Sequence, residues 1–303
     1  MNFKSVEDVK QRLESVNYIS SKEIATIVFL AEATSKPLLV EGPAGVGKTE
    51  LSKAVAKTLG RKMIRLQCYE GLDEAKALYE WEYAKQLLYT QIVKEKIRDV
   101  VSDAHSLPEA VDKIAEQEDA FFSDRFIQTR PLLQAIESKD PVVLLIDEVD
   151  KSDPEFEAFL LEILSDFQVS IPELGTRKAV SIPFVVLTSN NYRDMSDALK
   201  RRCLYLYIDY PDRELETRIV KLKIPGIEER LVNKLVDTIT KIRELDLKKK
   251  PSISETLDWA QSLMVLQVDD ISTEVIQDTL NVICKYRSDT DLVRRSITSI
   301  IAS

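Results

Sequence analysis

The chain has 303 residues, 44% hydrophobic and 31% charged, which is typical of a globular protein with a sizeable core, and its net charge of −9 disfavours broad nucleic-acid binding. The single histidine, His105, excludes a histidine-rich metal site, and three widely separated cysteines, Cys68, Cys203 and Cys284, indicate buried thiols rather than disulfides or metal ligands. No apolar run reaches membrane-spanning length and residues 1–4 lack the apolar core of a signal peptide, so we expect a cytoplasmic protein.

The first 36 residues are predicted to form two helices. Apolar residues recur at helical spacing from Val6 to Val16, and a second apolar stripe begins after Tyr18. Ser20 and Glu23 have the spacing of a capping box, which predicts the start of the second helix there. The apolar run over residues 37–40 then predicts a buried strand.

A glycine-rich loop follows that strand and leads directly into another helical pattern. Gly42, Gly45 and Gly47 are three of the seven glycines in the chain. Such a loop turns backbone N–H groups toward phosphate oxygens, and the next helix adds the positive end of its dipole. Lys48 would reach the β- and γ-phosphates and the Thr49 hydroxyl would ligate Mg²⁺. The predicted nucleoside triphosphate site comprises Gly42, Pro43, Ala44, Gly45, Val46, Gly47, Lys48, Thr49 and Glu50.

Residues 62–66 predict a second strand, and the segment after it is rich in aromatic residues. The aromatic residues of 67–97 allow either a ligand surface or, as we favour, helices packed on the edge of the sheet. Residues 98–125 are acidic and lack glycine, which favours an insertion outside the sheet.

The apolar run over residues 141–146 predicts a strand buried on both faces of a parallel sheet, and two carboxylates follow it. Asp147 would hold Mg²⁺ through water, and Glu148 would orient and polarise the water that attacks the γ-phosphate. An acidic helix N-cap is the alternative for an isolated pair, but the upstream phosphate loop favours the catalytic interpretation.

The next stretch predicts a helix, a hairpin and another buried strand. Ser152 and Glu155 have capping spacing before an apolar helical stripe, and residues 168–182 predict a β-hairpin. Residues 184–190 predict the strand, with Asn190 at its tip. That side chain suits a hydrogen bond to the γ-phosphate or the attacking water, and equally a turn.

A final strand is predicted through residues 205–208, and the pattern is helical from 212 to 303. We therefore place a domain boundary near residue 211. Residues 1–210 form the predicted α/β nucleotide-binding domain, a parallel sheet flanked by helices, and 211–303 a small all-helical lid. The lysine run at 248–250 favours a solvated helix end over a nucleic-acid contact.

In this order and spacing, the Gly42–Thr49 loop, the strand ending at Glu148, Asn190 and the Arg201-Arg202 pair resemble the AAA+ ATPases. Within them the chain resembles the MoxR group, and most closely the subgroup associated with carbon monoxide dehydrogenase maturation. The specific stretches are 67–72, 77–81, 161–169, 171–175 and 199–205.

The resemblance implies a homo-oligomeric ring, expected to be hexameric, with ATP and Mg²⁺ at subunit interfaces. It implies that Gly42–Thr49 is Walker A, Asp147 and Glu148 are Walker B, and Asn190 is the first sensor. Arg201 or Arg202 would be an arginine finger, with Arg202 favoured. The family's second-sensor arginine would fall near residues 254–256, where this chain has a glutamate.

Family members act as chaperone-like remodelers, usually beside a protein with a von Willebrand factor A domain. We therefore expect an ATPase that remodels or matures a client complex, such as a metalloenzyme. A nucleotide-gated binding scaffold with little turnover is the alternative, although an intact Glu148 argues against it. A nucleic-acid motor is disfavoured by the net charge.

Overall fold

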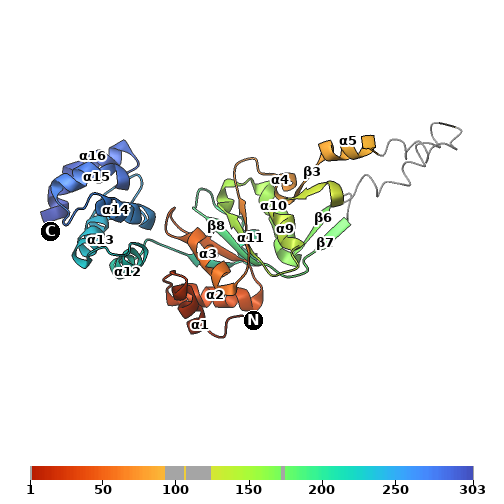
Figure 1. Ribbon diagram of the computed structural model, residues 1–303, viewed down its shortest axis with the longest axis horizontal. Coiled ribbons are helices and arrows are strands. Elements are labelled where there is room, and N and C mark those ends of the chain that lie inside the picture. Colours follow the sequence, from red (N-terminus) through yellow and green to blue (C-terminus); the bar gives the residue numbers. More distant parts are fainter. Residues whose placement is uncertain (1, 93–105, 107–123, 172–174, 303) are drawn as a thin grey trace.

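The computed structural model describes residues 2–92, 106, 124–171 and 175–302. The insertion expected at residues 98–125 lies almost entirely outside these residues. Within them, a five-stranded sheet forms the centre of the first two thirds of the chain (Figure 1). Its strands are β1 (Leu38–Glu41), β2 (Met63–Gln67), β5 (Val143–Asp147), β8 (Phe184–Ser189) and β9 (Leu204–Tyr207).

The sheet is parallel, with the order β2-β5-β8-β1-β9. The predicted strands are therefore confirmed, and β5 and β8 are fully buried, as their continuous apolar runs require. Because all five run the same way, the residues that follow them collect along one edge of the sheet.

Two helical layers cover the sheet, because successive strand residues point to opposite faces. Leu38 and Val40 pack in one core and Leu39 in the other. The first layer contains α1 (Val6–Ser15), α2 (Lys22–Thr34) and α3 (Lys48–Leu59), and the second contains α4 (Glu74–Leu78), α9 (Pro131–Ile136), α10 (Pro154–Asp166) and α11 (Asp197–Arg202).

Two predicted helix caps were wrong by one residue. The cap of α2 is Ser21, whose Oγ accepts a hydrogen bond from the Ile24 N–H at 3.1 Å, whereas Ser20 is buried. The cap of α10 is Asp153, followed by Pro154 in the first turn, and Ser152 Oγ donates instead to the Val149 carbonyl at 2.7 Å. That serine caps the carboxyl end of the short 3₁₀ segment η2 (Val149–Lys151) that follows β5.

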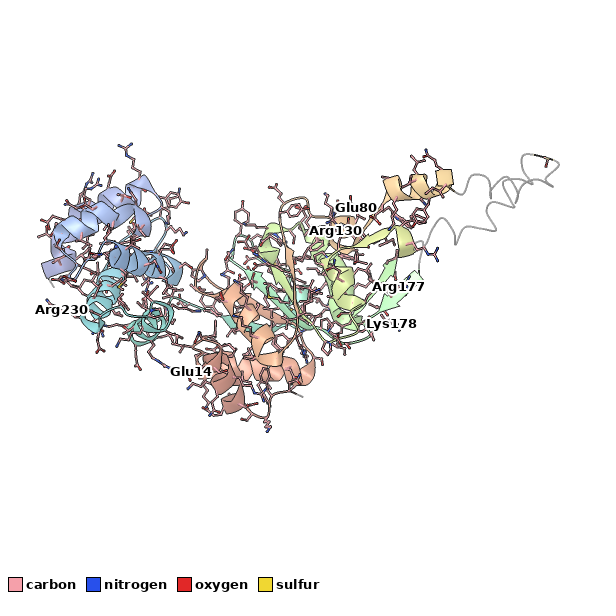
Figure 2. All side chains as sticks on the ribbon, viewed as in Figure 1. Glu14, Glu80, Arg130, Arg177, Lys178 and Arg230 are labelled. Carbon is pink, nitrogen blue, oxygen red and sulfur yellow. The ribbon has the colours of Figure 1, made fainter. Side chains whose placement is uncertain are left out.

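Two small antiparallel sheets flank the main one within the described residues. β6 (Gln168–Ile171) and β7 (Gly175–Lys178) form the predicted hairpin, although its second strand ends at residue 178 and not at the predicted residue 182. β3 (Tyr79–Trp81) pairs with β4 (Ile127–Thr129), so this part of the aromatic segment is a strand and not the helix we favoured. Arg130 forms an ion pair with Glu80 beside this sheet (Figure 2). The helix α5 (Tyr83–Ile92) follows β3, and η1 (Asp124–Phe126) precedes β4.

The helices beyond residue 212 have a separate hydrophobic core and lie to one side of the sheet (Figure 1). Trp259 is fully buried in that core. Arg218 donates to Glu14 of α1 at 2.9 Å, and Glu14 lies on the side of α1 that faces these helices (Figure 2). The helices are α12 (Arg213–Lys223), α13 (Glu229–Glu244), α14 (Ile253–Val265), α15 (Thr273–Ile283) and α16 (Arg287–Ala302).

The three cysteines are buried free thiols, as predicted, and burial raises the pKa of each. Among the helices in the described part of the chain, none has the length and apolar character needed to cross a bilayer.

Candidate functional site

The glycine-rich loop lies between β1 and α3, and close packing explains two of its glycines. Gly42 has φ of 148°, and a Cβ there would lie 2.0 Å from the Ile208 carbonyl oxygen. Gly45 has φ of 82°, and a Cβ there would lie 2.1 Å from Ser252 Oγ. Side chains at these positions would collide with backbone and with a buried serine, so the loop requires glycine.

Lys48 lies at the start of α3 and is 6% exposed. Its Nζ donates to the carbonyl oxygens of Gly42 and Pro43, at 2.7 Å each. A third bond, of 2.8 Å, reaches Asn190 Oδ1. Burial lowers the pKa of Lys48 to about 8, although the neighbouring acidic residues, foremost Asp150, act to raise it. The ammonium group is thus held by the loop that would surround a phosphate.

Asp147 is the last residue of β5 and accepts hydrogen bonds from two threonines. Thr49 Oγ1 lies 3.1 Å from Asp147 Oδ1, and Thr188 Oγ1 donates to the same oxygen. Thr188 also accepts a bond of 2.9 Å from the Glu148 N–H. The two threonines therefore position the adjacent carboxylates at the carboxyl edge of the sheet.

Glu148 has φ of 57°, a left-handed conformation that costs free energy for a residue with a side chain. Its carboxylate accepts bonds from three residues. Asn190 Nδ2 donates to Oε1 at 3.2 Å, while Gln67 Nε2 at 2.9 Å and Lys151 Nζ at 2.7 Å bond Oε2. Asn190 therefore connects Glu148 with Lys48 through the two ends of one amide.

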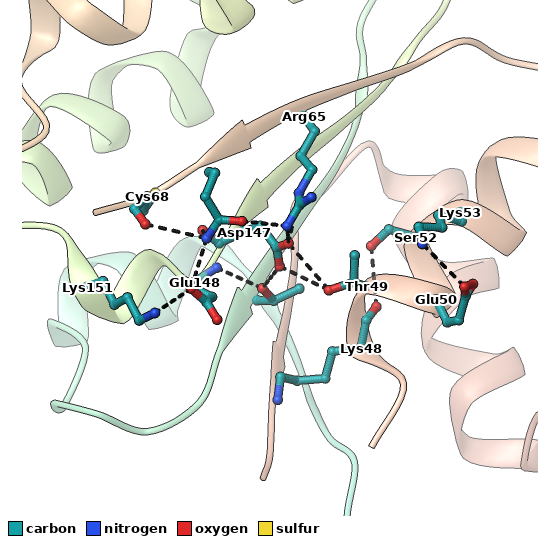
Figure 3. Close-up of polar contacts among 12 residues, drawn as sticks. Lys48, Thr49, Glu50, Ser52, Lys53, Arg65, Cys68, Asp147, Glu148 and Lys151 are labelled. Atoms are coloured by element: carbon teal, nitrogen blue, oxygen red, sulfur yellow. Dashed lines mark hydrogen bonds and ion pairs between the residues drawn. The ribbon is translucent and has the colours of Figure 1, made fainter. Parts of the chain in front are cut away.

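Sequence reasoning missed Arg65 and Gln67, which bring the edge strand β2 into the site. Arg65 Nη2 and Nε lie 2.6 and 3.0 Å from Asp147 Oδ2 (Figure 3). The same Nη2 donates to Gln67 Oε1 at 2.5 Å. The available signal was the alternation within β2: Ile64 and Leu66 are buried, so Arg65 and Gln67 share the opposite face.

A cavity of about 280 Å³ is lined by the polar residues Lys48, Thr49, Arg65, Asp147, Glu148, Thr188 and Asn190, together with Ala44, Gly45, Gly47, Glu50, Lys53 and Ser254. A second cavity, of about 150 Å³, adjoins the same loop, and its lining includes the apolar residues Tyr18, Ile24, Ile208, Leu215, Ile219 and Leu257. Gly45, Gly47 and Glu50 line both, and Val46 lines the apolar one. A polar and an apolar cavity thus share the glycine-rich loop as a wall.

The oxygen atoms of Thr49 and Asp147 fit a magnesium ion, which prefers hard oxygen ligands and completes its shell with water and phosphate oxygens. Protein side chains alone would not hold the ion, because no group of three or more metal-ligating His, Cys, Asp or Glu side chains occurs in the part of the chain that the structure describes. The pair suits a metal that arrives with a phosphate ligand.

The start of α14 lies against the loop at the expected second-sensor position. Ser254 Oγ donates to the Gly45 carbonyl at 3.2 Å. Glu255 does not face the loop in this way: its carboxylate accepts from the Ser252 N–H at 2.9 Å and from Lys249 at 3.2 Å, forming the capping box of the helix. A serine hydroxyl therefore contacts the loop at the position where the resemblance implied an arginine.

Arg201 and Arg202 lie in the last turn of α11 and do not line the polar cavity. Both are exposed. Arg202 Nε donates to Ser165 Oγ of α10 at 2.6 Å, and its Nη1 donates to the Ala198 carbonyl at 3.3 Å. The structure thus brings together Lys48, Thr49, Asp147, Glu148 and Asn190 but leaves the two arginines outside that cluster.

Comparison with protein families identifies one matching model, the ATPase family associated with various cellular activities (AAA), over residues 38–209. Similar proteins include the gas vesicle ATPase GvpN of Haloferax mediterranei, 24% identical over 80% of this chain and 66% of that protein. The chain therefore spans slightly less than two thirds of that relative's length. An uncharacterized protein of Staphylococcus saprophyticus is 23% identical over 86% of this chain and 88% of its own.

Among solved structures, a mutant of RuvB from Thermotoga maritima aligns with a TM-score of 0.49 and 18% identity, over 92% of this chain and 71% of that one.

Proposed function

The chain belongs to the AAA family of ATPases, and from this membership we propose that it binds ATP with Mg²⁺ and hydrolyses it to ADP and phosphate. One observation carries the proposal. Lys48 and Thr49 at the start of α3, Asp147 and Glu148 at the end of β5, and Asn190 directly after β8 converge on one cavity at the carboxyl edge of the sheet.

The residues of this cavity suit the parts of phosphoryl transfer. Loop N–H groups and Lys48 would bind the β- and γ-phosphates, and for this the Lys48 ammonium must leave the Gly42 and Pro43 carbonyl oxygens. Thr49 and Asp147 would hold Mg²⁺, which neutralises phosphate charge when bound. Glu148 would accept the proton of the attacking water, and Asn190 lies between it and Lys48 to orient both.

The apolar cavity supports a place for the base and sugar of the nucleotide. It adjoins the glycine-rich loop and contacts both the sheet domain and α14. We therefore treat residues 1–210 as the nucleotide-binding domain and 211–303 as a lid over the nucleotide.

We further propose that the chain forms a ring, in keeping with the family, and that ATP hydrolysis drives a change in a client complex. The MoxR-like stretches, such as 67–72 and 199–205, support a chaperone-like role beside a von Willebrand factor A protein, with metalloenzyme assembly as the finer proposal. Co-purification with and without ATP tests the partner: such a protein should be retained more strongly with ATP than with ADP.

The test of hydrolysis is the Glu148→Gln variant. It preserves the size of the side chain and one acceptor oxygen but removes the proton acceptor, so ATP should bind with wild-type affinity while turnover falls by about 10² or more. Glu155→Gln, an exposed carboxylate in the first turn of α10, is the matched control and should retain wild-type turnover. Wild-type turnover by Glu148→Gln would show that the proton acceptor lies elsewhere.

Turnover measured with and without DNA separates the two other functions considered. A scaffold would show tight ATP binding with negligible hydrolysis, and a nucleic-acid motor would show hydrolysis stimulated by DNA.

A further inference from the structure

We propose that Arg65 is a built-in counter-cation for Asp147, and that its guanidinium must leave this carboxylate before Asp147 can face a magnesium ion. Arg65 would thereby set the Mg²⁺ concentration at which the chain binds nucleotide tightly. This inference rests on the proposed function, because it assumes that Mg²⁺ and nucleotide bind at the same cavity.

The contacts of Asp147 leave neither of its oxygens free. Oδ1 accepts from Thr49 and Thr188, and Oδ2 accepts two N–H bonds from Arg65, of 2.6 and 3.0 Å. A short N–H⁺···O⁻ bond of this kind is among the stronger hydrogen bonds in proteins. Arg65 thus binds Oδ2, which lies 3.4 Å from Thr49 Oγ1, whereas Oδ1 lies 3.1 Å from the same hydroxyl.

Asp147 and Arg65 differ sharply in exposure, and we infer from this that Arg65 is the side chain that moves. The Asp147 side chain is 4% exposed and the Arg65 side chain is 49% exposed. Asp147 is buried, so leaving its carboxylate without a counter-charge would cost free energy, and this favours its ion pair with Arg65. Exposure leaves Arg65 free to turn into solvent or toward a bound phosphate without moving the backbone of β2.

The strand register explains how an edge strand supplies this charge. Arg65 is paired with Leu145, two residues before Asp147, so the guanidinium reaches along the strands toward the carboxyl edge of the sheet. Gln67, which is paired with Asp147 itself, receives the Arg65 Nη2 bond at 2.5 Å and directs the guanidinium inward. Its other end bonds Glu148, so departure of Arg65 also removes one partner from the amide that holds the proposed proton acceptor.

A guanidinium and a divalent cation that use the same carboxylate must compete. Removing the guanidinium should strengthen the attraction of Asp147 for Mg²⁺. It should also weaken nucleotide binding in the absence of metal, because an unpaired carboxylate repels phosphate. Loss of Arg65 should therefore strengthen the effect of Mg²⁺ and weaken metal-free nucleotide binding. If Arg65 only stabilised the fold, its loss would weaken nucleotide binding both with and without Mg²⁺.

The experiment is a titration of wild type, Arg65→Met and Arg65→Lys with a fluorescent ATP analogue, first in EDTA and then over a series of Mg²⁺ concentrations. For Arg65→Met the Mg²⁺ midpoint should fall by roughly tenfold and the affinity in EDTA should fall. Arg65→Lys keeps a charge but not two N–H donors on one oxygen, so its midpoint should shift the same way by less.

Arg213→Met is the matched control, because it removes another half-exposed arginine that pairs with a carboxylate, Asp237 of α13. Its midpoint should equal that of the wild type. Unchanged or raised midpoints in both Arg65 variants would overturn the role of Arg65 while leaving nucleotide binding intact. A wild-type protein that binds no nucleotide at any Mg²⁺ concentration would overturn the proposed function and this inference together.

Discussion

The Lys48 ammonium group is buried, and the pH dependence of nucleotide binding can be predicted from its pKa. The pKa of Lys48 in the free protein is about 8, lowered by burial. Phosphate oxygens favour the charged ammonium, so nucleotide binding should raise that pKa. Below pH 8 the lysine is already charged, whereas above pH 8 binding must take up a proton.

We therefore expect nucleotide affinity to fall as pH rises above 8, approaching tenfold per pH unit, while Lys48→Ala should abolish binding. Titrations between pH 7 and pH 9.5, about the range over which a lysine with this pKa changes charge, give the slope. Calorimetry at pH above 8 in buffers with different ionisation heats should show uptake of close to one proton. A flat affinity profile across this range would contradict the argument.

The contacts in the site show which of its features could be predicted from the sequence and which could not. The placement of Lys48, Thr49, Asp147 and Glu148 in one cavity was predictable, because a glycine-rich loop and a strand end of a parallel sheet meet at the same edge. Asn190 follows its strand as predicted, but its bonds to Lys48 and Glu148 were not specified by the sequence. The contact of Arg65 with Asp147 joins residues 82 positions apart, and no local pattern in β2 specifies it.

At the scale of elements, a buried ion pair between α12 and α13 holds the C-terminal helices together. Arg243 Nη1 and Nη2 donate to the two oxygens of Glu216, at 2.6 and 2.7 Å. The side chains are 11% and 0% exposed. Thr256 of α14 donates to the same carboxylate at 2.7 Å, so three helices depend on one charge.

Removing Arg243 should leave Glu216 buried without its counter-charge. We expect Arg243→Met to lower the free energy of unfolding of the lid by about 3–5 kcal/mol. Urea denaturation followed by Trp259 fluorescence measures the change, since Trp259 is buried in the lid core. Arg213 pairs with Asp237 between the same two helices but at the surface, and Arg213→Met should have a much smaller effect. Equal effects of the two variants would contradict the assignment.

Elements were predictable wherever burial forces a pattern. β5 and β8 are covered on both faces and therefore read as continuous apolar runs. The strand Tyr79–Trp81 was missed because its partner, Ile127–Thr129, lies beyond the insertion, and a three-residue strand has too little alternation to identify. The caps at Ser21 and Asp153 were missed by one residue because neighbouring polar residues compete for the same position.

At the scale of the whole molecule, the exposed arginines of α11 require a second copy of the chain to act at the cavity. Arg202 lies outside its own site, so as a finger it would reach the γ-phosphate of a neighbour. A guanidinium supplied this way can contribute roughly 10³ or more in rate. Arg202→Ala should bind ATP normally and hydrolyse it slowly, and Arg201→Ala is the matched comparison with near wild-type turnover.

Mixing tests whether the site is shared. Subunits carrying Arg202→Ala, exchanged with subunits carrying Glu148→Gln, should regain activity because some interfaces combine an intact Glu148 with an intact Arg202. A rate equal to the sum of the separate residual rates would argue against a shared site for this residue.

The packing of Gly45 against the start of α14 has a consequence for how this sequence can evolve. The loop carbonyl bonds Ser254, which stands 209 positions later, and the space beyond the Gly45 Cα is already filled by Ser252. A bulkier residue on either side would push the lid away from the phosphate loop. Among descendants of a common ancestor, we therefore expect substitutions at the two serines to stay small and to co-vary with the loop, although Ser254 lies 209 positions after Gly45.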